Sequence, residues 1–463
     1  LLAAAAIATS IARADIIEIS GASSSFYGSL NPNSAFSYVL VDGYYDPDLF
    51  WSSSTGTLTG TADVLTIPGH SNYRFSGASS NLTKLVGSAY DGTTSRVILW
   101  SPLVGTNVKL LSSLSGVTNE SIGRYGYGSN LKLTVSADVS TVYGAYYQGG
   151  TSKLYRWSGI SGLSADLLGS VFPMGNIAPY KMLMTADASA VAGYTQVGSD
   201  VYTFYWSQAT GAKNVSADLG SPSYVVPTGF SGNGSYLFAG RHDGGGAFSL
   251  FRWKASDGTY ITIPKPSGTD GFDVNTFFAS ADGNTAVGIH RDTTTGYNLF
   301  KWTQAGGTTG NLLASLSPTY VSLNGVSADL NIAYGYFMNS QVGSHAFRRD
   351  NAANINIDLQ AGLTGSFYAL AMSANGNYIL GQKDSAIAWR WSAADGYQTV
   401  SDWLLANGAD PTIINTWTFK SAHAVSEDGK TVLGYGMKGM NYSYYIASAA
   451  SGVADYEIWL SSI

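Results

Sequence analysis

Residues 277–288 read Phe-Phe-Ala-Ser-Ala-Asp-Gly-Asn-Thr-Ala-Val-Gly, and residues 299–302 read Leu-Phe-Lys-Trp. Asp-Gly between two apolar runs is a strong hairpin signal, because both residues tolerate the positive φ of a tight turn. The stretch therefore predicts three short antiparallel strands, which we call A, B and C in chain order. A weaker fourth strand, D, is expected next, at 310–313.

The same order of features recurs through the chain. Ser231-Gly232-Asn233-Gly234 precedes Phe251-Arg252-Trp253, and Ser373-Ala374-Asn375-Gly376 precedes Trp389-Arg390-Trp391. In each copy strand B is expected to end on a glycine, where a bulge or a close backbone approach is typical. These repeat glycines come roughly every 48 residues, a period typical of a repeated supersecondary unit. They are Gly43, Gly87, Gly144, Gly193, Gly240, Gly288, Gly335, Gly381 and Gly434.

Four short strands per unit at this period predict an all-β fold, a β-propeller whose four-stranded units are blades. A right-handed β-helix is the main alternative, but its coils are usually shorter and lack a hairpin in each unit. Nine repeat glycines indicate eight or nine blades, with nine favoured by the count. The last unit lacks a D strand. Residues 15–20 are expected to supply it and so to close the ring without a free edge.

The propeller is expected to be a single domain at 15–447, followed by a tail at 448–463. Hydrophobic residues make up 45% of the chain and charged residues 12%, and the net charge is −6. No basic stripe is present, so nucleic acid is not an expected partner. Cysteine is absent, which excludes thiolate metal sites and thiol nucleophiles, and no cofactor is expected. Beyond the N-terminus, no apolar run approaches the ~18 residues of a membrane helix.

The N-terminal segment 1–14 has the pattern of a secretory signal. Residues 1–11 are apolar, and Ala12-Arg13-Ala14 is a small-residue cleavage site of the A-x-A kind. Since an initiating Met and a basic n-region are missing, the segment is interpreted as a signal remnant, with a surface helix as the alternative. The mature chain is then expected to begin at Asp15 and to be exported. The expected location is extracellular or on the outer-membrane surface, and the periplasm stays open.

The repeat of Ser-Ala-Asp-Gly, a glycine and Phe-Arg-Trp resembles the bacterial extracellular repeats of the HAF family over residues 75–447. Residues 402–429 resemble the closing unit of those proteins, in which Asp402 is suited to cap a short helix and Gly408 to end it. The ending at 459–463, Trp-Leu-Ser-Ser-Ile, resembles the junction that precedes an autotransporter barrel. The resemblance implies an extracellular propeller, as an autotransporter passenger in some members, and it implies no particular activity.

Few residues form a pattern with a known chemistry. The five histidines lack zinc-motif spacing, so no metal site is predicted from them. The turn aspartates Asp138, Asp187, Asp282, Asp329 and Asp428 are expected to support the turns, because Asp accepts local backbone N–H bonds. The C-strand tryptophans are expected to pack between blades, with a glycan-stacking platform as the alternative. They are Trp51, Trp100, Trp157, Trp206, Trp253, Trp302 and Trp391.

The residues directly after each repeat glycine form the candidate binding site. In a propeller the B–C loops share one face with the connections between blades, so these residues are expected to gather there. Aromatic and charged side chains on one face are suited to bind a sugar or an acidic ligand, whereas ordinary polar loops are the alternative. His242 and His290 lie on neighbouring units, which leaves a metal or acid/base role open. The candidate binding residues are His242, Asp243, His290, Arg291, Asp292, Lys383 and Asp384.

Three functions are consistent with these patterns. The first is a non-catalytic, exported surface propeller that binds or adheres to a carbohydrate or to another surface protein, and the lack of a catalytic motif favours it. The second is a glycan hydrolase or lyase with its site on the B–C loop face. The third is a structural subunit of the cell surface.

Overall fold

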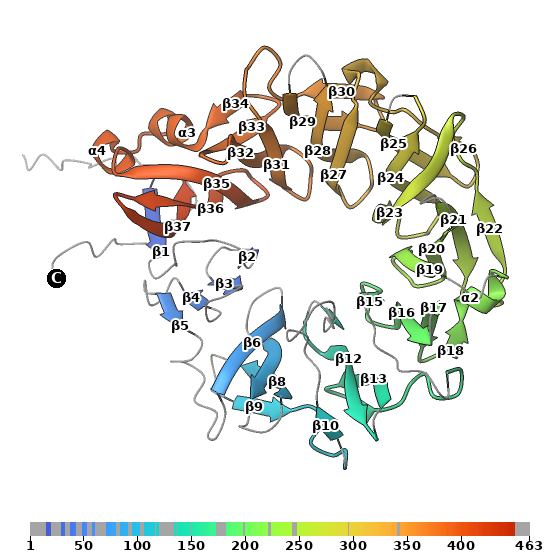
Figure 1. Ribbon diagram of the computed structural model, residues 1–463. Coiled ribbons are helices and arrows are strands. Elements are labelled where there is room, and N and C mark those ends of the chain that lie inside the picture. Colours follow the sequence, from blue (N-terminus) through green and yellow to red (C-terminus); the bar gives the residue numbers. More distant parts are fainter. Residues whose placement is uncertain are drawn as a thin grey trace, which may run out of the picture.

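The computed structural model confirms an all-β propeller. It describes residues 15–19, 29–32, 38–42, 49–52, 58–60, 71–79, 84–90, 95–101, 106–115, 117–119, 134–136, 138–149, 151–172, 182–197, 200–220, 224–242, 248–294, 296–339 and 343–449. The described strands form nine antiparallel sheets arranged in a ring (Figure 1). The predicted signal segment 1–14 and the tail from 450 onward lie outside the described residues.

In seven of the nine described sheets the strands pair in chain order, with strand A nearest the centre of the ring and strand D at its outside (Figure 1). In the third sheet two strands pair with the same partner, and the last sheet takes its fourth strand from the N-terminal end of the described chain. The first four sheets consist of β2 (Ser29–Pro32), β3 (Tyr38–Asp42), β4 (Leu49–Ser52) and β5 (Leu58–Gly60); β6 (Ser71–Ala78), β7 (Leu85–Tyr90), β8 (Ser95–Ser101) and β9 (Thr106–Lys109); β10 (Val117–Asn119), β11 (Thr134–Val135), β12 (Thr141–Gln148), β13 (Thr151–Ser158) and β14 (Gly162–Ser164); and β15 (Met182–Met184), β16 (Ala190–Val197), β17 (Asp200–Ser207) and β18 (Gly211–Asn214).

The remaining sheets follow the same plan, and the described helices are short. The sheets consist of β19 (Val225–Phe230), β20 (Tyr236–His242), β21 (Phe248–Lys254) and β22 (Tyr260–Ile263); β23 (Thr269–Ala279), β24 (Thr285–Asp292), β25 (Gly296–Thr303) and β26 (Gly307–Thr309); β27 (Tyr320–Val326), β28 (Ile332–Asn339), β29 (Gly343–Asp350) and β30 (Ile355–Asp358); β31 (Phe367–Met372), β32 (Tyr378–Lys383), β33 (Ile387–Ser392) and β34 (Gly396–Thr399); and β35 (Trp417–Val425), β36 (Thr431–Lys438), β37 (Asn441–Ser448) and β1 (Asp15–Ile19). The helices are α2 (Val215–Asp218), η1 (Ala314–Leu316), α3 (Val400–Ala406) and α4 (Pro411–Ile414).

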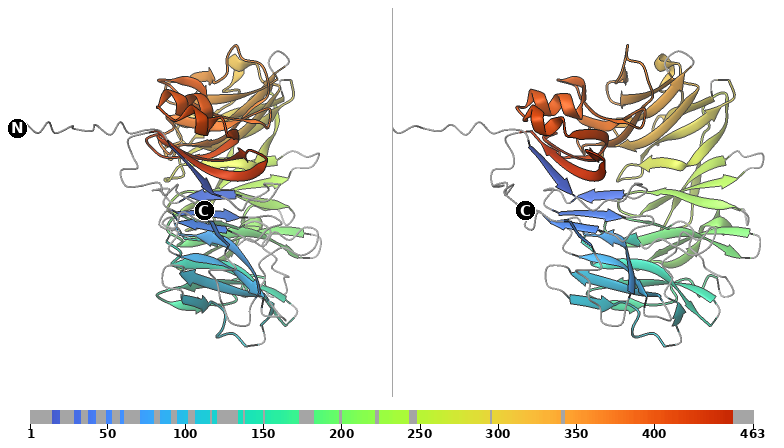
Figure 2. Two further views of the ribbon diagram at one scale, coloured as in Figure 1. Left: turned by 90° about the vertical axis from the view of Figure 1, so that its left-hand side faces the viewer. Right: turned by 60° about the vertical axis from the view of Figure 1, so that its left-hand side comes forward.

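The ring is closed by the two ends of the described chain. Strand β1 pairs antiparallel with β37, from Asp15 opposite Ser448 to Ile19 opposite Tyr444, so it is the D strand of the last sheet. The predicted pairing is therefore confirmed. Strand β2 contacts β35 and β36, and Figure 2 shows β2–β5 (blue) between the last sheet (red) and β6–β9.

The A–B turns follow one hydrogen-bond scheme, which confirms the structural role predicted for their aspartates. In the turn before β24, Ser280 Oγ donates to Asp282 Oδ1 at 2.6 Å, and the same oxygen accepts the Asn284 N–H at 2.9 Å. The Thr285 N–H donates to Ser280 Oγ at 2.9 Å. Asn375 Oδ1 accepts the same pair of bonds in its own turn, so the scheme needs a side-chain oxygen rather than a charge.

The eight repeat glycines among the described residues, Gly87 to Gly434, lie inside strand B, so the prediction that strand B ends there is wrong for them, while Gly43 lies outside the described residues. Gly288 is the fourth residue of β24, which continues to Asp292. The predicted close approach is confirmed, because a Cβ on Gly381 would overlap the carbonyl oxygen of Tyr368 on strand A. Strand A bulges beside this point, where the register shifts between Ala369 and Ala371. Because glycine has no side chain, strand B can continue alongside the bulge in strand A.

Two local predictions need correction. The prediction of a D strand at 310–313 is wrong. Strand D of the sheet β23–β26 is β26 at Gly307–Thr309, and the chain turns at 310–313, where Leu313 is buried. Helix α3 is capped by Thr399, whose hydroxyl oxygen accepts the Asp402 N–H at 3.0 Å. The Asp402 carboxylate in turn accepts the Thr399 hydroxyl at 2.7 Å. Asp402 thus lies in the first helical turn rather than at the cap.

The core lies between neighbouring sheets. Trp253 is 0% and Trp302 is 2% exposed, which confirms that these C-strand tryptophans pack between sheets rather than forming a surface platform. The indole N–H of Trp253 donates to Asp218 at 2.9 Å, so burial leaves no unpaired donor there.

The two faces of the ring carry different connections between strands. On the loop face, B–C loops meet the D–A connections, as where the Asp384 N–H donates to the Ser366 carbonyl at 2.8 Å. On the turn face, A–B turns meet C–D turns, as where the Gln304 N–H donates to the Asn284 carbonyl at 2.9 Å. The predicted grouping of B–C loops with the connections between sheets therefore holds in the described residues.

Candidate functional site

Strand alternation separates the candidate residues at the end of β24. Because β24 continues to Asp292, successive side chains point to opposite sides of the sheet. His290 is 0% and Asp292 is 7% exposed, whereas Arg291 is exposed and lies 3.7 Å from Asp270. Only Arg291 of these three therefore presents its side chain at the loop face.

His290 uses both of its ring nitrogens inside the protein. Its Nε2 accepts the Asn311 N–H at 3.2 Å, so Nδ1 carries the proton and donates to Thr269 Oγ1 at 2.8 Å. Burial lowers the pKa of His290, although the nearby Asp292 opposes this. Because both nitrogens of this neutral imidazole are hydrogen-bonded inside the protein, neither has a lone pair free to bind a metal ion or to accept a proton from a substrate.

The other candidate residues lie at the edge of the loop face. His242 is half-buried, with its ring 5.6 Å from Tyr224 and 5.1 Å from Phe248, and Asp243 lies outside the described residues. Lys383 Nζ lies 5.2 Å from the centre of the Phe367 ring. Asp384 accepts the Ser366 N–H at 2.7 Å. The binding role of this set stays a prediction.

A row of four tyrosines crosses three neighbouring sheets at the loop face, and we call it the tyrosine tract. The ring of Tyr297 on β25 lies 5.5 Å from that of Tyr320 on β27. Tyr320 lies 6.1 Å from Tyr336 on β28, and Tyr336 lies 5.0 Å from Tyr368 on β31. Aromatic rings at these separations attract one another, so the tract is a preorganised surface.

Strand register places one end of the tract beside a predicted residue. Tyr297 is directly opposite Arg291, and Tyr320 is opposite Met338 near the end of β28. Tyr368 follows Phe367, which lies opposite Lys383. Arg291 therefore lies beside one end of the tract, whereas Tyr368 and Lys383 have side chains on opposite sides of their sheet.

Tyr320, in the middle of the tract, remains neutral over the physiological pH range. Burial raises the pKa of Tyr320, and the neighbouring Tyr336 raises it further. Tyr320 is nevertheless 39% exposed, so one side of its ring system is open to a ligand. The sequence carried a signal for the tract, since Tyr320 and Tyr368 stand near the start of strand A in successive repeats.

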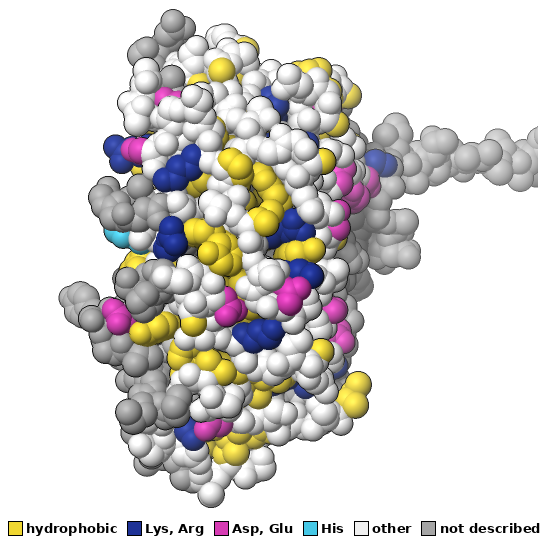
Figure 3. Space-filling view, turned by 90° about the vertical axis from the view of Figure 1, so that its right-hand side faces the viewer, with side chains coloured by type: hydrophobic (Ala, Val, Ile, Leu, Met, Phe, Trp, Pro, Cys, Tyr) yellow, Lys and Arg dark blue, Asp and Glu magenta, His cyan; other side chains and the backbone are white. Residues whose placement is uncertain are grey.

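The tract differs from the hydrophobic residues on the outer wall. Figure 3 views the wall formed around β22, where hydrophobic, basic and acidic side chains are interspersed. Tyr260 and Ile261 on β22 are 43% and 45% exposed. Single exposed apolar residues are normal on soluble proteins, whereas a connected row of rings is not.

The described residues offer little acid/base chemistry. His345 Nδ1 lies 2.9 Å from Asp358, which resembles a base with its orienting carboxylate. However, His345 is 0% exposed and lies edge-on to Phe367 at 5.5 Å, so its other nitrogen cannot reach a substrate. Within the described ranges, no group of three His, Cys, Asp or Glu side chains is placed to hold a metal ion. Nor does any described helix combine the length and apolar character needed to cross a bilayer.

Comparisons with known proteins support the fold and no activity. No protein-family model and no curated protein matches the chain. Among solved structures, a eukaryotic initiation factor is similar at 9% identity and a TM-score of 0.50, over 82% of this chain and 90% of that one. The Dos1 propeller matches at 12% identity and a TM-score of 0.44, over 82% of this chain and 94% of that one. The oligogalacturonate lyase of Vibrio parahaemolyticus matches at 12% identity and a TM-score of 0.40, over 94% of this chain and 98% of that one. Such low identities carry no statement on function.

Proposed function

We propose that the chain is a non-catalytic, exported propeller that binds glycan chains through the tyrosine tract on its loop face. The observation that carries the proposal is the continuous row from Tyr297 to Tyr368 across three sheets. Tyrosine has an apolar ring and a polar hydroxyl, which match the C–H faces and hydroxyl groups of sugars. Arg291, directly opposite Tyr297, adds hydrogen-bond donors at one end of the tract.

The cellular setting is part of the same proposal. The signal-like segment 1–14 and the HAF-like repeat support export to the cell surface. On a bacterial surface, a glycan-binding propeller would serve adhesion. A glycan hydrolase or lyase is not favoured, because both ring nitrogens of His290 are engaged inside the protein.

Native gel electrophoresis through soluble polysaccharides tests the proposal. A polysaccharide that binds should retard the wild-type protein, and Tyr320→Ala should weaken binding about tenfold, since an aromatic contact contributes ~1.5 kcal/mol. Tyr260→Ala is the matched control, because Tyr260 is 43% and Tyr320 is 39% exposed but Tyr260 lies on the outer wall.

Two results would contradict the proposal. One is equal retardation of the wild-type protein and the Tyr320→Ala variant. The other is the absence of retardation by every polysaccharide, which would favour a protein partner or a structural surface role. Melting curves of both variants verify that the fold is intact.

A further inference from the structure

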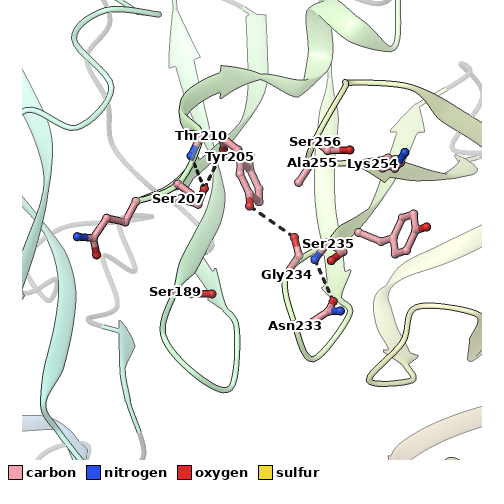
Figure 4. A pocket seen from close by; sticks show the side chains of 13 residues that line it. Ser189, Tyr205, Ser207, Thr210, Asn233, Gly234, Ser235, Lys254, Ala255 and Ser256 are labelled. Atoms are coloured by element: carbon pink, nitrogen blue, oxygen red, sulfur yellow. Dashed lines mark hydrogen bonds between the residues drawn. The ribbon is translucent and has the colours of Figure 1, made fainter.

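A pocket of about 750 Å³ lies on the turn face between the sheets β15–β18 and β19–β22. Its walls come from the A–B and C–D turns of both sheets, and they include Ser207, Thr210, Asn233 and Ser256. The buried ring of Tyr205 lies between the two walls (Figure 4). The pocket is therefore on the opposite face of the ring from the tyrosine tract.

The pocket is open because a side-chain contact that fills the next junction, between β19–β22 and β23–β26, is missing here. At the next junction, Arg252 on β21 lies over the Tyr236 ring at 3.6 Å and reaches the following sheet, where it donates to Asn284 and Gln304. We call this arrangement the arginine strap. It fills the space between the two sheets at the turn face.

Two substitutions remove the strap at the pocket. Arg252 pairs with Phe238 on strand B, and the equivalent pair in the preceding sheet is Tyr205 with Ala192. Ala190 likewise takes the place of Tyr236 at the start of strand B. The Tyr205 hydroxyl reaches the next sheet only through a 3.5 Å bond to the Gly234 carbonyl (Figure 4).

The lining of the pocket is polar and almost uncharged. Its lining residues include no carboxylate and no imidazole, and their one cation, Lys254, already pairs with Asp257 at 2.7 Å. Ser207 Oγ and Thr210 Oγ1 lie 2.8 Å apart. The amide oxygen of Asn233 accepts the Ser235 N–H at 3.0 Å, while its amide nitrogen has no partner among the described residues.

We propose that this pocket binds a neutral saccharide. Hydroxyl and amide groups both donate and accept hydrogen bonds, as sugar hydroxyls require, and the partly exposed ring of Tyr236 offers apolar surface. An ionic ligand would lack an unpaired counter-charge, and an apolar ligand would bury unsatisfied hydroxyls. The volume is within the range of small-molecule sites. The inference is independent of the tyrosine tract.

To test the proposal, a bulky side chain introduced at an exposed position is used to fill the pocket. Ala209 lines the pocket in the C–D turn of its sheet, and Ala305 has the same position in the turn between β25 and β26. Ala209→Trp should fill the pocket, and Ala305→Trp is the matched control, because both alanines are exposed. The probes are methyl glycosides of neutral hexoses and of the corresponding uronic acids, measured by saturation-transfer NMR on the full chain.

The expected result is saturation transfer to a neutral glycoside in wild-type protein and in Ala305→Trp, with at least a tenfold loss of affinity in Ala209→Trp. Equal binding by Ala209→Trp, preference for the uronic acids, or no transfer to any neutral glycoside would each overturn the proposal. The Tyr320→Ala variant separates the two sites, because a signal that it loses and Ala209→Trp keeps belongs to the tyrosine tract. Melting curves establish that both tryptophan variants fold.

Discussion

The guanidinium of Arg252 lies 3.6 Å from the centre of the Tyr236 ring, and both side chains come from one sheet. From there Arg252 donates to Asn284 at 3.2 Å and to Gln304 at 2.8 Å in the next sheet. Arg390 lies over Tyr378 at 5.5 Å, but it donates to Asp395 and Gln398 within its own sheet. At the junction of Arg252 the basic residue of the aromatic–basic–Trp pattern thus joins two sheets, whereas at the junction that holds the pocket Tyr205 occupies the equivalent position.

Removal of the strap should destabilise the ring. Arg252→Met removes two hydrogen bonds from a charged group that is 4% exposed, and we expect a loss of about 2–3 kcal/mol in the free energy of unfolding. Lys301→Met is the control, because Lys301 holds the equivalent position in β25 and no strap is formed there. Urea titrations of both variants provide the measurement. Equal losses in the two variants would show that the strap contributes nothing.

The turn aspartates should make stability depend on acid pH. Hydrogen bonds from Ser136 and the Ser140 N–H hold the pKa of Asp138 at about 2. The pKa values of Asp282 and Asp329 are lowered by the same kind of bonds. A lowered native pKa stabilises the fold above the unfolded pKa of about 3.9, and that contribution is lost as the pH falls through the native pKa. The melting temperature should therefore fall between about pH 4 and pH 2.

A triple variant isolates this effect. Asn supports the turns at positions 233 and 375, so replacement of Asp138, Asp282 and Asp329 by Asn should keep the fold at pH 7. The variant should lose less stability than wild type between about pH 4 and pH 2. Parallel melting curves for the two proteins over that interval would assign the acid sensitivity to other groups.

Sequence predicted the repeat and the strands better than it predicted the site. The Asp-Gly turns and the aromatic C strands are local signals, and the turn hydrogen bonds and the burial of Trp253 follow them. The end of strand B could not be predicted, because it depends on a bulge in strand A that only the tertiary pairing creates. His290 was therefore assigned to a loop, whereas strand alternation turns it inward.

Ring closure should depend on β1 alone within the N-terminal region. Deletion of residues 1–19 removes the partner of β37 and leaves an exposed edge strand, so we expect a lower melting temperature and aggregation. Deletion of residues 1–14 keeps β1 and should leave the melting curve unchanged. Light scattering during heating compares the two deletion variants with the full chain. Identical behaviour of the two deletions would contradict closure by β1.

Replacement of a repeat glycine by alanine should destabilise the protein, because there is no space for the added methyl group. In Gly381→Ala the new Cβ would overlap the Tyr368 carbonyl and the Trp389 ring, and we expect a loss of about 3 kcal/mol. In Gly159→Ala the nearest atom is 3.7 Å from the new Cβ, so stability should change by less than about 0.5 kcal/mol. Denaturant midpoints of the two variants provide the comparison. If Gly381→Ala keeps wild-type stability, strand A can move away from the new methyl group and the prediction is contradicted.

The most direct measurement is a titration of protein labelled with ¹³C in its 31 tyrosine rings, followed by aromatic NMR. The titrant is the polysaccharide that most strongly retards the wild-type protein in native gels. The ring signals of the tyrosine tract should shift together as the polysaccharide is added, while those of Tyr260 on the outer wall stay in place. Shifts confined to Tyr260 or to other rings outside the tract, with the tract unchanged, would contradict glycan binding at the loop face.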